Sequence, residues 1–162
     1  MMDDDLILMD ESDVQEATDL VLRAMNAEEG RWAARTMQFH FDCRRHEIDD
    51  GRTYYVCRQN SAIHGLVGLH HVLWGPEENV WLAWFAVEPA CQGQGLGRKL
   101  LAAIEKVAVG KGFRKLLVET YEHVDFAKAR RFYENNGFHE AGRIAGYLSD
   151  GSAMIVYAKA IV

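Results

Sequence analysis

Residues 81–111 read WLAWFAVEPACQGQGLGRKLLAAIEKVAVGK and combine three features in a row. The first is an apolar run rich in aromatic and β-branched residues, which predicts a buried strand that stops at Pro89. A loop with glycines at positions 93, 95 and 97 follows, and apolar residues at helical spacing then predict a helix that ends near Gly110. Glycines allow several backbone amides to point at one anion, and the first turn of a helix adds unpaired amides. We therefore expect an anion site at this loop, of a size that suits a pyrophosphate.

The spacing of the glycines distinguishes between three kinds of phosphate loop. The dinucleotide-binding fingerprint requires a third glycine at the position of Arg98. The loop of nucleoside triphosphatases requires Lys-Ser or Lys-Thr after Gly97, where this chain has Arg98 and Lys99. The pattern that does fit is Gln-x-x-Gly-x-Gly, which is met by Gln92, Gly95 and Gly97.

This pattern, with the Phe-Ala-Val-Glu-Pro run at 85–89, resembles the GNAT superfamily of N-acetyltransferases, in which it lies between a strand and a long helix. A second segment, ARRFYENNGF at 129–138, resembles the Ala-x-x-Phe-Tyr-x-x-x-Gly-Phe segment of the same family. The two motifs occur in the family's order, with a strand-like run between them. The resemblance implies a mixed α/β fold of the α+β kind, in which a central, mostly antiparallel twisted sheet of about seven strands is flanked by about four helices.

Periodicity along the chain predicts elements in a matching order. Ser12 and Gln15 have the spacing of a capping box, which predicts a first helix from there to Glu29 or Gly30. The other predicted elements are strands at 6–9, 53–58, 62–74, 80–88, 115–120, 138–146 and 153–160, and helices that end near residues 46, 110 and 135. The order β-α-α-β-β-β-α-β-α-β-β fits one domain over residues 1–162.

Composition and charge limit the partners of the chain. Of its 162 residues 49% are apolar, and the net charge is −6 with a pI near 5.6. Nucleic acids and anionic membranes attract basic patches, so we expect neither as a partner. The first residues, MMDDD, are acidic where a secretory signal is basic, and no apolar run approaches the roughly 20 residues that span a bilayer. We therefore expect a cytoplasmic protein.

The three cysteines, Cys43, Cys57 and Cys91, have neither metal-ligand nor Cys-x-x-Cys spacing. We expect reduced, mostly buried thiols and no metal site. No sequence feature supplies a base that would activate Cys57 or Cys91 as a nucleophile.

The resemblance implies that acetyl-CoA is the acetyl donor. Its pantetheine arm would dock beside the strand through the backbone of Phe85, Ala86 and Val87. Phe126 and Ala129 also belong to the implied cofactor site, and Phe126 stands where many family members have an asparagine that bonds the cofactor. The pyrophosphate would bind the loop through Gln92, Gly93, Gln94, Gly95, Leu96, Gly97 and Arg98.

The same resemblance implies two catalytic residues. Tyr133 matches the family tyrosine that lies near the sulfur of the cofactor and protonates the departing thiolate. Glu119 resembles a glutamate that some members use, often through water, to accept the proton of the amine. A structural role is the alternative for each residue: Tyr133 as a packed aromatic side chain, and Glu119 as a carboxylate at a strand edge.

We interpret the chain as an N-acetyltransferase that transfers the acetyl group directly to a primary amine in a ternary complex. The acceptor is a small-molecule amine or an amine of a protein, and four aromatic residues suggest a partly apolar pocket for it: Trp32, Trp74, Trp84 and Tyr147. Trp32 also lies on a helical stripe with Thr36, Phe39 and Cys43, which either packs on the sheet or shapes this pocket.

Two other classes of function remain as alternatives. One is a catalytically silent module that binds or senses acyl-CoA, which would keep the loop amides but need no Tyr133. The other is a nucleotide-dependent enzyme of a different fold. A homodimer is an expectation from the resemblance alone.

Overall fold

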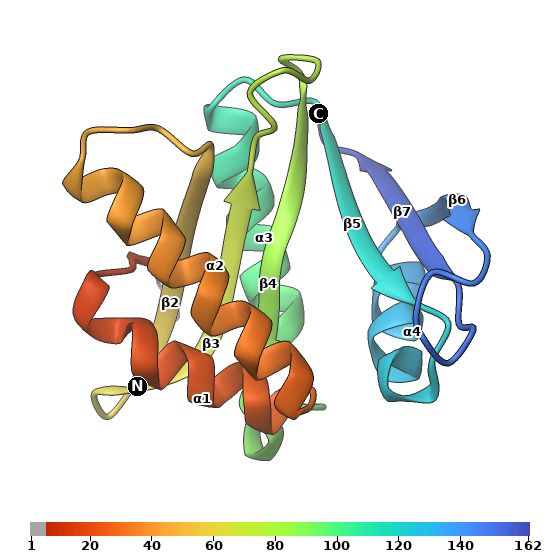
Figure 1. Cartoon of the computed structure of the whole chain (residues 1–162), viewed down its shortest axis with the longest axis horizontal. Helices are drawn as coiled ribbons and strands as arrows, with labels where there is room; N and C mark the ends of the chain where they lie inside the picture. Colours follow the sequence, from red (N-terminus) through yellow and green to blue (C-terminus); the bar gives the residue numbers. More distant parts are fainter. Residues whose placement is uncertain (1–5) are drawn as a thin grey trace.

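A seven-stranded mixed sheet forms the centre of the part of the chain that the structure describes, residues 6–162 (Figure 1). In this computed structural model the strands lie in the order β1-β2-β3-β4-β5-β7-β6. Their bounds are Ile7–Leu8 (β1), Arg52–Gln59 (β2), Ala62–His70 (β3), Asn79–Val87 (β4), Lys115–Tyr121 (β5), His139–Ile144 (β6) and Met154–Ala160 (β7). Within the same residues the α-helices are Val14–Ala24 (α1), Ala27–Arg45 (α2), Leu96–Gly110 (α3) and Ala127–Asn135 (α4). The predicted fold class is confirmed.

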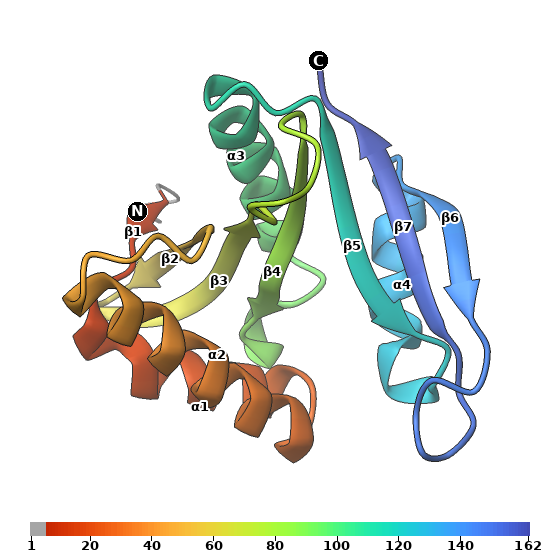
Figure 2. The ribbon, with the colours of Figure 1, turned by 45° about the horizontal axis from the view of Figure 1, so that its top comes forward.

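The sheet is divided into two arms where β4 meets β5. These two strands run parallel, with α3 as the crossover, and they pair only where Asn79–Trp81 faces Lys115–Leu117. Strand β4 then continues to Val87 on β3, while β5 continues to Tyr121 on β7, so the strands diverge toward their C-terminal ends (Figure 2). The first arm contains β1 to β4 with α1, α2 and α3, and the second contains β5, β7 and β6 with α4 (Figures 1 and 2).

Hydrophobic clusters hold the helices on the sheet. Helices α1 and α2 bury Leu20, Val21 and Met37 against the first strands. Helices α3 and α4, which lie on the other face, bury Ile104 and Tyr133 in a second cluster (Figure 2). Full burial of each large apolar side chain is worth about 1.5–3 kcal/mol relative to exposure, so these clusters fix the positions from which the site is built.

Helices α1 and α2 approach each other at Gly30. A Cβ atom at this position would lie 2.9 Å from Cβ of Leu22, so only glycine permits the observed distance between the two backbones. This close contact holds the first turn of α2 against α1. Within residues 6–162, no helix combines the length and the apolar character needed to cross a membrane.

The start and end of α1 differ from the prediction. Asp10, and not Ser12, caps the preceding 3-10 helix Glu11–Asp13, in a capping box with Asp13. Helix α1 ends at Ala24, well before Gly30, because Asn26 begins a new helix: its Oδ1 accepts a hydrogen bond from the backbone N–H of Glu29 at 2.8 Å. Glu29 and Gly30 therefore belong to the first turn of α2.

Two further expectations about side chains and strands are wrong. The predicted strand from Ala62 to Trp74 stops at His70, after which a turn leads to β4. Of the predicted stripe on α2, Cys43 is buried, but Trp32 and Phe39 are 46% and 54% exposed and do not pack on the sheet. The buried face of the helix instead carries Ala33, Met37, His40 and Phe41, because the helix starts later and turns a different side to β2 and β3.

Candidate functional site

A β-bulge in β4 shapes the edge of the first arm. Leu66 pairs with Ala86 and Gly68 with Ala83, so Trp84 and Phe85 stand opposite the single residue Val67. Trp84 has a φ of +52°, a left-handed value that is uncommon for a bulky residue. The bulge interrupts the pairing of β4 with β3 and therefore releases backbone groups at the point where β4 diverges from β5.

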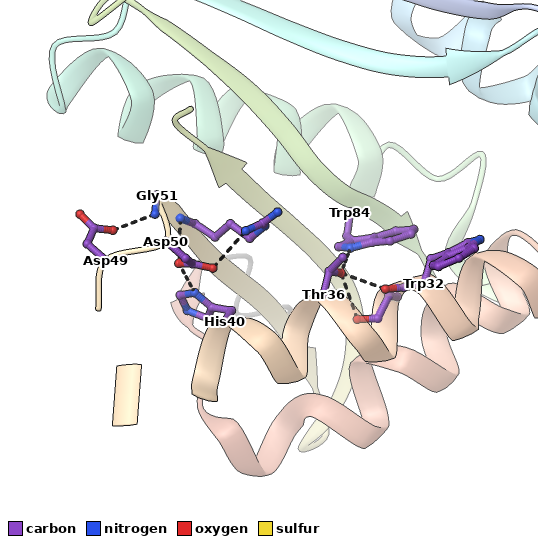
Figure 3. Close-up of polar contacts among 9 residues, drawn as sticks. Trp32, Thr36, His40, Asp49, Asp50, Gly51 and Trp84 are labelled. Carbon is purple, nitrogen blue, oxygen red and sulfur yellow. Dashed lines mark hydrogen bonds and ion pairs between the residues drawn. The ribbon is translucent and has the colours of Figure 1, made fainter. Parts of the chain in front are cut away.

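The two bulge residues point to different helices. The indole Nε1 of Trp84 donates a 2.6 Å hydrogen bond to Oγ1 of Thr36 on α2, and that hydroxyl donates in turn to the carbonyl oxygen of Trp32 at 3.0 Å (Figure 3). The ring of Phe85 lies 5.4 Å from that of Phe132 on α4. The bulge is thus held between the helices on the two faces of the sheet.

The glycine loop presents a run of unpaired amides. Gly93 and Gly95 have φ values of +75° and +89°, which only glycine adopts without strain, and the loop leads directly into α3. No backbone carbonyl or side chain of residues 6–162 accepts a hydrogen bond from the amides of residues 93–98. A Cβ at either Gly93 or Gly95 would meet nothing within 4 Å, so the loop is open on the outside. These amides, with the positive end of the α3 dipole, fit the phosphates of a nucleotide cofactor.

Side chains brace this loop from within. Nε2 of Gln92 donates to the carbonyl oxygen of Val87 at 3.1 Å, and Nε2 of Gln94 donates to that of Ala90 at 2.8 Å. A Cβ at Gly97 would lie 3.2 Å from the ring of Phe132, so the start of α3 packs closely on α4. Of the residues predicted to bind the pyrophosphate, Gln94 can therefore contribute its backbone N–H, whereas the N–H of Gln92 already donates to the carbonyl oxygen of Pro89 at 3.3 Å, and the side chain of Arg98 is exposed.

Tyr133 lies at the buried centre of the second arm. Its ring is 5% exposed and contacts the rings of Phe138 and Phe85 at centroid distances of 5.4 and 6.4 Å. Burial raises the pKa of Tyr133 above its ordinary value, so the phenol is protonated at neutral pH. The phenol makes no hydrogen bond to any residue from 6 to 162 and can donate its proton to a ligand. Tyr133 and the bulge residue Phe85 are thus brought together across the divergence of β4 and β5.

We call this part of the molecule the donor side, after the acetyl donor expected there from the sequence: Phe85–Val87, the loop 92–98 and Tyr133. The two remaining predicted cofactor residues border it on the second arm. Phe126 is buried and packs its ring 5.1 Å from that of Tyr121, and Ala129 packs against the same hydrophobic cluster as Tyr133. Phe126 therefore offers an apolar wall where the family pattern has a polar amide.

A second group of side chains surrounds Glu119 and consists of Glu29, Tyr121 and Tyr147. We call these four residues the acceptor side, after the amine expected from the sequence as acceptor. The hydroxyl of Tyr121 donates a 2.7 Å hydrogen bond to Oε1 of Glu119, two residues earlier on β5. The rings of Tyr121 and Tyr147 stack at 6.0 Å and 19°. Burial, and after it the hydrogen bond to Glu119, raises the pKa of Tyr121, so its hydroxyl remains a donor.

Glu29 on α2 adds a second carboxylate to the acceptor side. Burial raises the pKa of Glu29 above its ordinary value, and the negative charges of Glu28 and Glu119 raise it further. Two carboxylates from different arms of the sheet therefore repel each other across this site. A cation placed between them relieves that repulsion.

Asn26 connects the two arms beside the acceptor side. Its Nδ2 donates to Oδ2 of Asp125 at 3.3 Å, while its Oδ1 caps α2. Asp125 belongs to the 3-10 helix Val124–Phe126 that precedes α4. The link fixes the first turn of α2, with Glu29, against the end of β5.

The predicted site residues fall into these two groups and not into one. Among the described residues, no hydrogen bond or ion pair joins Tyr133 to Glu119, which lie on different faces of β5. Of the aromatic residues predicted for an acceptor pocket, Tyr147 lies on the acceptor side and Trp84 lies in the bulge. Trp74 is excluded: it is 90% exposed and precedes β4, whereas the glycine loop follows that strand at its other end.

Sequence reasoning missed Glu29, Tyr121 and Asn26. A signal for Tyr121 was present in the alternation of β5, which puts residues 119 and 121 on the same face. No local signal existed for Glu29, because its position depends on where α2 begins. Within residues 6–162 no group of three or more His, Cys, Asp or Glu side chains could hold a metal ion.

Comparison with known proteins identifies the family. The model of the acetyltransferase (GNAT) family matches residues 15–138, while no curated protein matches the chain. A solved structure from Desulfovibrio desulfuricans, described as an acetyltransferase of the GNAT family, is similar with a TM-score of 0.84 and 23% identity over 98% of this chain and 99% of that one.

Two further solved structures share the fold. The ribosomal-protein-S18-alanine N-acetyltransferase of Escherichia coli aligns with a TM-score of 0.71 and 24% identity, over 97% of this chain and 93% of its own. An aminoglycoside 6'-N-acetyltransferase in complex with coenzyme A aligns with a TM-score of 0.75 and 16% identity, over 98% of this chain and 97% of its own. The chain belongs to the GNAT acetyltransferase family and is an acyltransferase.

Proposed function

We propose that the protein is an N-acetyltransferase that uses acetyl-CoA and transfers the acetyl group directly to a positively charged primary amine. The observation that carries this proposal is the divergence of β4 and β5, bordered by unpaired amides at residues 93–98 and by the buried phenol of Tyr133. Coenzyme A has a pyrophosphate for such amides and a peptide-like arm for the released backbone of β4.

The donor side binds and orients the acetyl donor. The loop amides hold the phosphates, and the backbone of Phe85 to Val87 pairs with the amides of the pantetheine arm. When bound, acetyl-CoA supplies a thioester whose carbonyl carbon an amine can attack. Tyr133 is protonated and has no protein partner within residues 6–162, so it is placed to give its proton to the leaving sulfur.

The acceptor side selects and deprotonates the amine. Glu29 and Glu119 attract an ammonium group, and the stacked rings of Tyr121 and Tyr147 offer a π surface to the same cation. Glu119 is exposed and accepts the proton that the amine loses, directly or through water. Both a small polyamine-like molecule and the amine of a protein meet these requirements.

The experiment that tests the function follows thiol release from acetyl-CoA with a panel of amines and N-terminal peptides, beside calorimetric titration of CoA. The variant is Tyr133→Phe, which keeps the ring contacts and removes a hydroxyl that bonds no residue in the described chain. We expect kcat to fall by about 10²-fold or more with unchanged CoA affinity, because a positioned general acid is typically worth 10²- to 10⁴-fold.

Tyr157→Phe is the matched control for this variant. Its ring lies in the same cluster as that of Tyr133, but its phenol already donates to Oε1 of Glu134 at 2.8 Å. We expect this variant to lose some stability and to keep its kcat. Binding of CoA without turnover of any acceptor would favour the silent acyl-CoA module, and a chain that does not bind CoA would refute both readings.

A further inference from the structure

The structure places a histidine beside a cysteine outside the site described above. Nδ1 of His64, on β3, lies 3.1 Å from Sγ of Cys91, which ends the 3-10 helix Pro89–Cys91. With its proton on Nε2, the imidazole accepts the S–H hydrogen through Nδ1. The two residues are 27 positions apart, which is why the sequence alone shows no base for this thiol.

The pair lines a small cavity between β2, β3 and the start of α3. Its volume is about 40 Å³, enough for water or for one sulfur-sized group, and Cys57, Arg58 and Lys99 contribute to the same lining. Cys91 is half-buried, in contrast to Cys43 and Cys57, which are 8% and 4% exposed. Cys91 is therefore the cysteine that a reagent can reach most easily.

The histidine is held firmly in this position. A Cβ at the next residue, Gly65, would lie 2.5 Å from Cδ1 of Leu100, so β3 packs directly on α3 here. The carbonyl oxygen of His64 also accepts a hydrogen bond from the backbone N–H of Glu88 at 2.8 Å. The imidazole and the thiol thus approach each other from two rigid elements.

The thiol is adjacent to the loop that presents the unpaired amides. The backbone N–H of Cys91 bonds to the carbonyl oxygen of Glu88 at 2.8 Å, and that of Gln92 bonds to Pro89 at 3.3 Å. These two bonds set the direction in which the chain enters residues 93–98. A group attached to Sγ of Cys91 would lie two residues before the first of these amides.

We propose that Cys91 and His64 form a thiol modification site that reacts with low-molecular-weight disulfides and thereby weakens binding of CoA at the adjacent loop. The second half of this proposal rests on the proposed function, whereas the first does not. The site is separate from the acyl transfer, since Cys91 precedes the glycine loop and contacts His64 on β3, whereas Tyr133 lies on α4.

The reaction is a thiol–disulfide exchange and needs no further oxidant. As Sγ of Cys91 attacks one sulfur of the disulfide, the thiol proton passes to Nδ1 of His64. The bond between the two sulfurs of the reagent breaks and a bond between Cys91 and one of them forms. The leaving thiolate then takes the proton from His64, so one disulfide and one thiol are present before and after.

The first test is the rate of reaction with 5,5'-dithiobis(2-nitrobenzoate), with the modified residue located by mass spectrometry. We expect the first adduct on Cys91 and at least a fivefold slower reaction in His64→Asn at pH 7. This difference should close near pH 10, where an ordinary thiol is ionised without a base. First reaction at another cysteine, or an equal rate in His64→Asn at pH 7, would overturn the proposal.

The second test compares CoA affinity before and after treatment with glutathione disulfide, with Cys91→Ser as the control variant. We expect at least a tenfold increase of the Kd for CoA in the modified protein, reversed by dithiothreitol, and no change in the treated Cys91→Ser variant. A glutathione adduct on Cys91 with unaltered CoA affinity would refute the coupling to the loop. If the untreated protein does not bind CoA, the proposed function fails, while the reactivity of Cys91 is still decided by the first test.

Discussion

The donor side and the acceptor side lie next to each other but are built from different material. The donor side depends on backbone: six consecutive amides without protein partners in the described residues, and the edge of β4 that β5 leaves unpaired beyond Trp81. The acceptor side depends on the side chains of Glu29, Glu119, Tyr121 and Tyr147, which come from α2, β5 and the loop between β6 and β7. A site made of consecutive backbone groups can be recognised from a short motif, whereas a site made of distant side chains is visible only in the folded chain.

The difference can be tested, because a change on the acceptor side should lower kcat/KM for the amine, whereas a change on the donor side should raise the Kd for CoA. The largest effect is expected for Glu119→Gln, which keeps the size of the side chain and an oxygen for the hydroxyl of Tyr121 but removes the proton acceptor. We expect kcat/KM for the amine to fall by about 10²- to 10⁴-fold with unchanged CoA affinity, as measured by initial rates and calorimetry.

Glu77→Gln is the control for this change of charge. Glu77 is exposed in the loop before β4, at the end of the strand opposite to the glycine loop, so its neutralisation should leave both constants unchanged. If Glu119→Gln kept full activity at neutral pH, another base would have to be sought on the acceptor side.

On the donor side, an effect of intermediate size is expected for Gly95→Ala. The φ of +89° costs a residue with a Cβ about 1–2 kcal/mol, and relief of that strain would turn the amides away from their common target. We expect the Kd for CoA to rise roughly tenfold, the equivalent of about 1.4 kcal/mol, with the KM of the amine unchanged at saturating acetyl-CoA.

Gly110→Ala provides the comparison within the same helix. Gly110 ends α3, does not have a left-handed φ and has open space around its Cβ position, so alanine should be harmless there. Equal CoA affinities of the two glycine variants would show that the conformation of the loop is irrelevant to binding.

The smallest effect is expected on the stability of the folded protein, which the charged form of Glu29 lowers. The pKa of Glu29 is raised by burial and by its acidic neighbours, so its charged form is disfavoured in the folded chain. At pH 7 Glu29→Gln should therefore raise Tm by about 1–3 °C, or roughly 0.5–1 kcal/mol, while it weakens binding of a cationic amine.

The effect of Glu29→Gln on stability should depend on pH. A carboxyl group with a raised folded pKa is penalised above that pKa, and the penalty disappears as the pH falls below the unfolded value of about 4.3. The gain in Tm from Glu29→Gln should thus shrink as the pH is lowered toward 4, as measured by calorimetry. A gain that stayed constant over this range would mean that packing, and not charge, limits the stability at Glu29.

The sequence was sufficient for the order of the elements and for the location of the glycine loop. Gly93 and Gly95 do adopt left-handed backbone conformations, and the loop does join a strand to a helix. The start of α2 could not be predicted in the same way, because it depends on which polar residue ends α1 and begins α2. Asn26 prevails, since its cap and its bond to Asp125 fix the start of α2, and Trp32 and Phe39 turn outward as a result.

The bulge at Trp84 could not be predicted from the sequence either. It depends on the pairing of β4 with a strand that lies earlier in the chain, and on the hydroxyl of Thr36, which receives the indole N–H. Periodicity describes which side of a strand a residue faces, and a bulge breaks that alternation without leaving a mark in the composition. The contact between His64 and Cys91 belongs to the same class, since it joins two elements that the sequence does not relate.

The limited pairing of β4 with β5 has a consequence for how the native state opens. Backbone pairing joins the two arms at only three pairs of residues in this sheet, whereas side chains join them through the bond from Asn26 to Asp125, the ion pair of Lys159 with Glu105, and the hydrophobic cluster that contains both Ile104 and Tyr133. These two arms therefore form units that separate with the loss of few backbone hydrogen bonds, but only by exposing part of the cluster that they share. A ligand that bridges both arms would join these units, so that amide hydrogens in β5 and β7 would exchange no faster than those in β3.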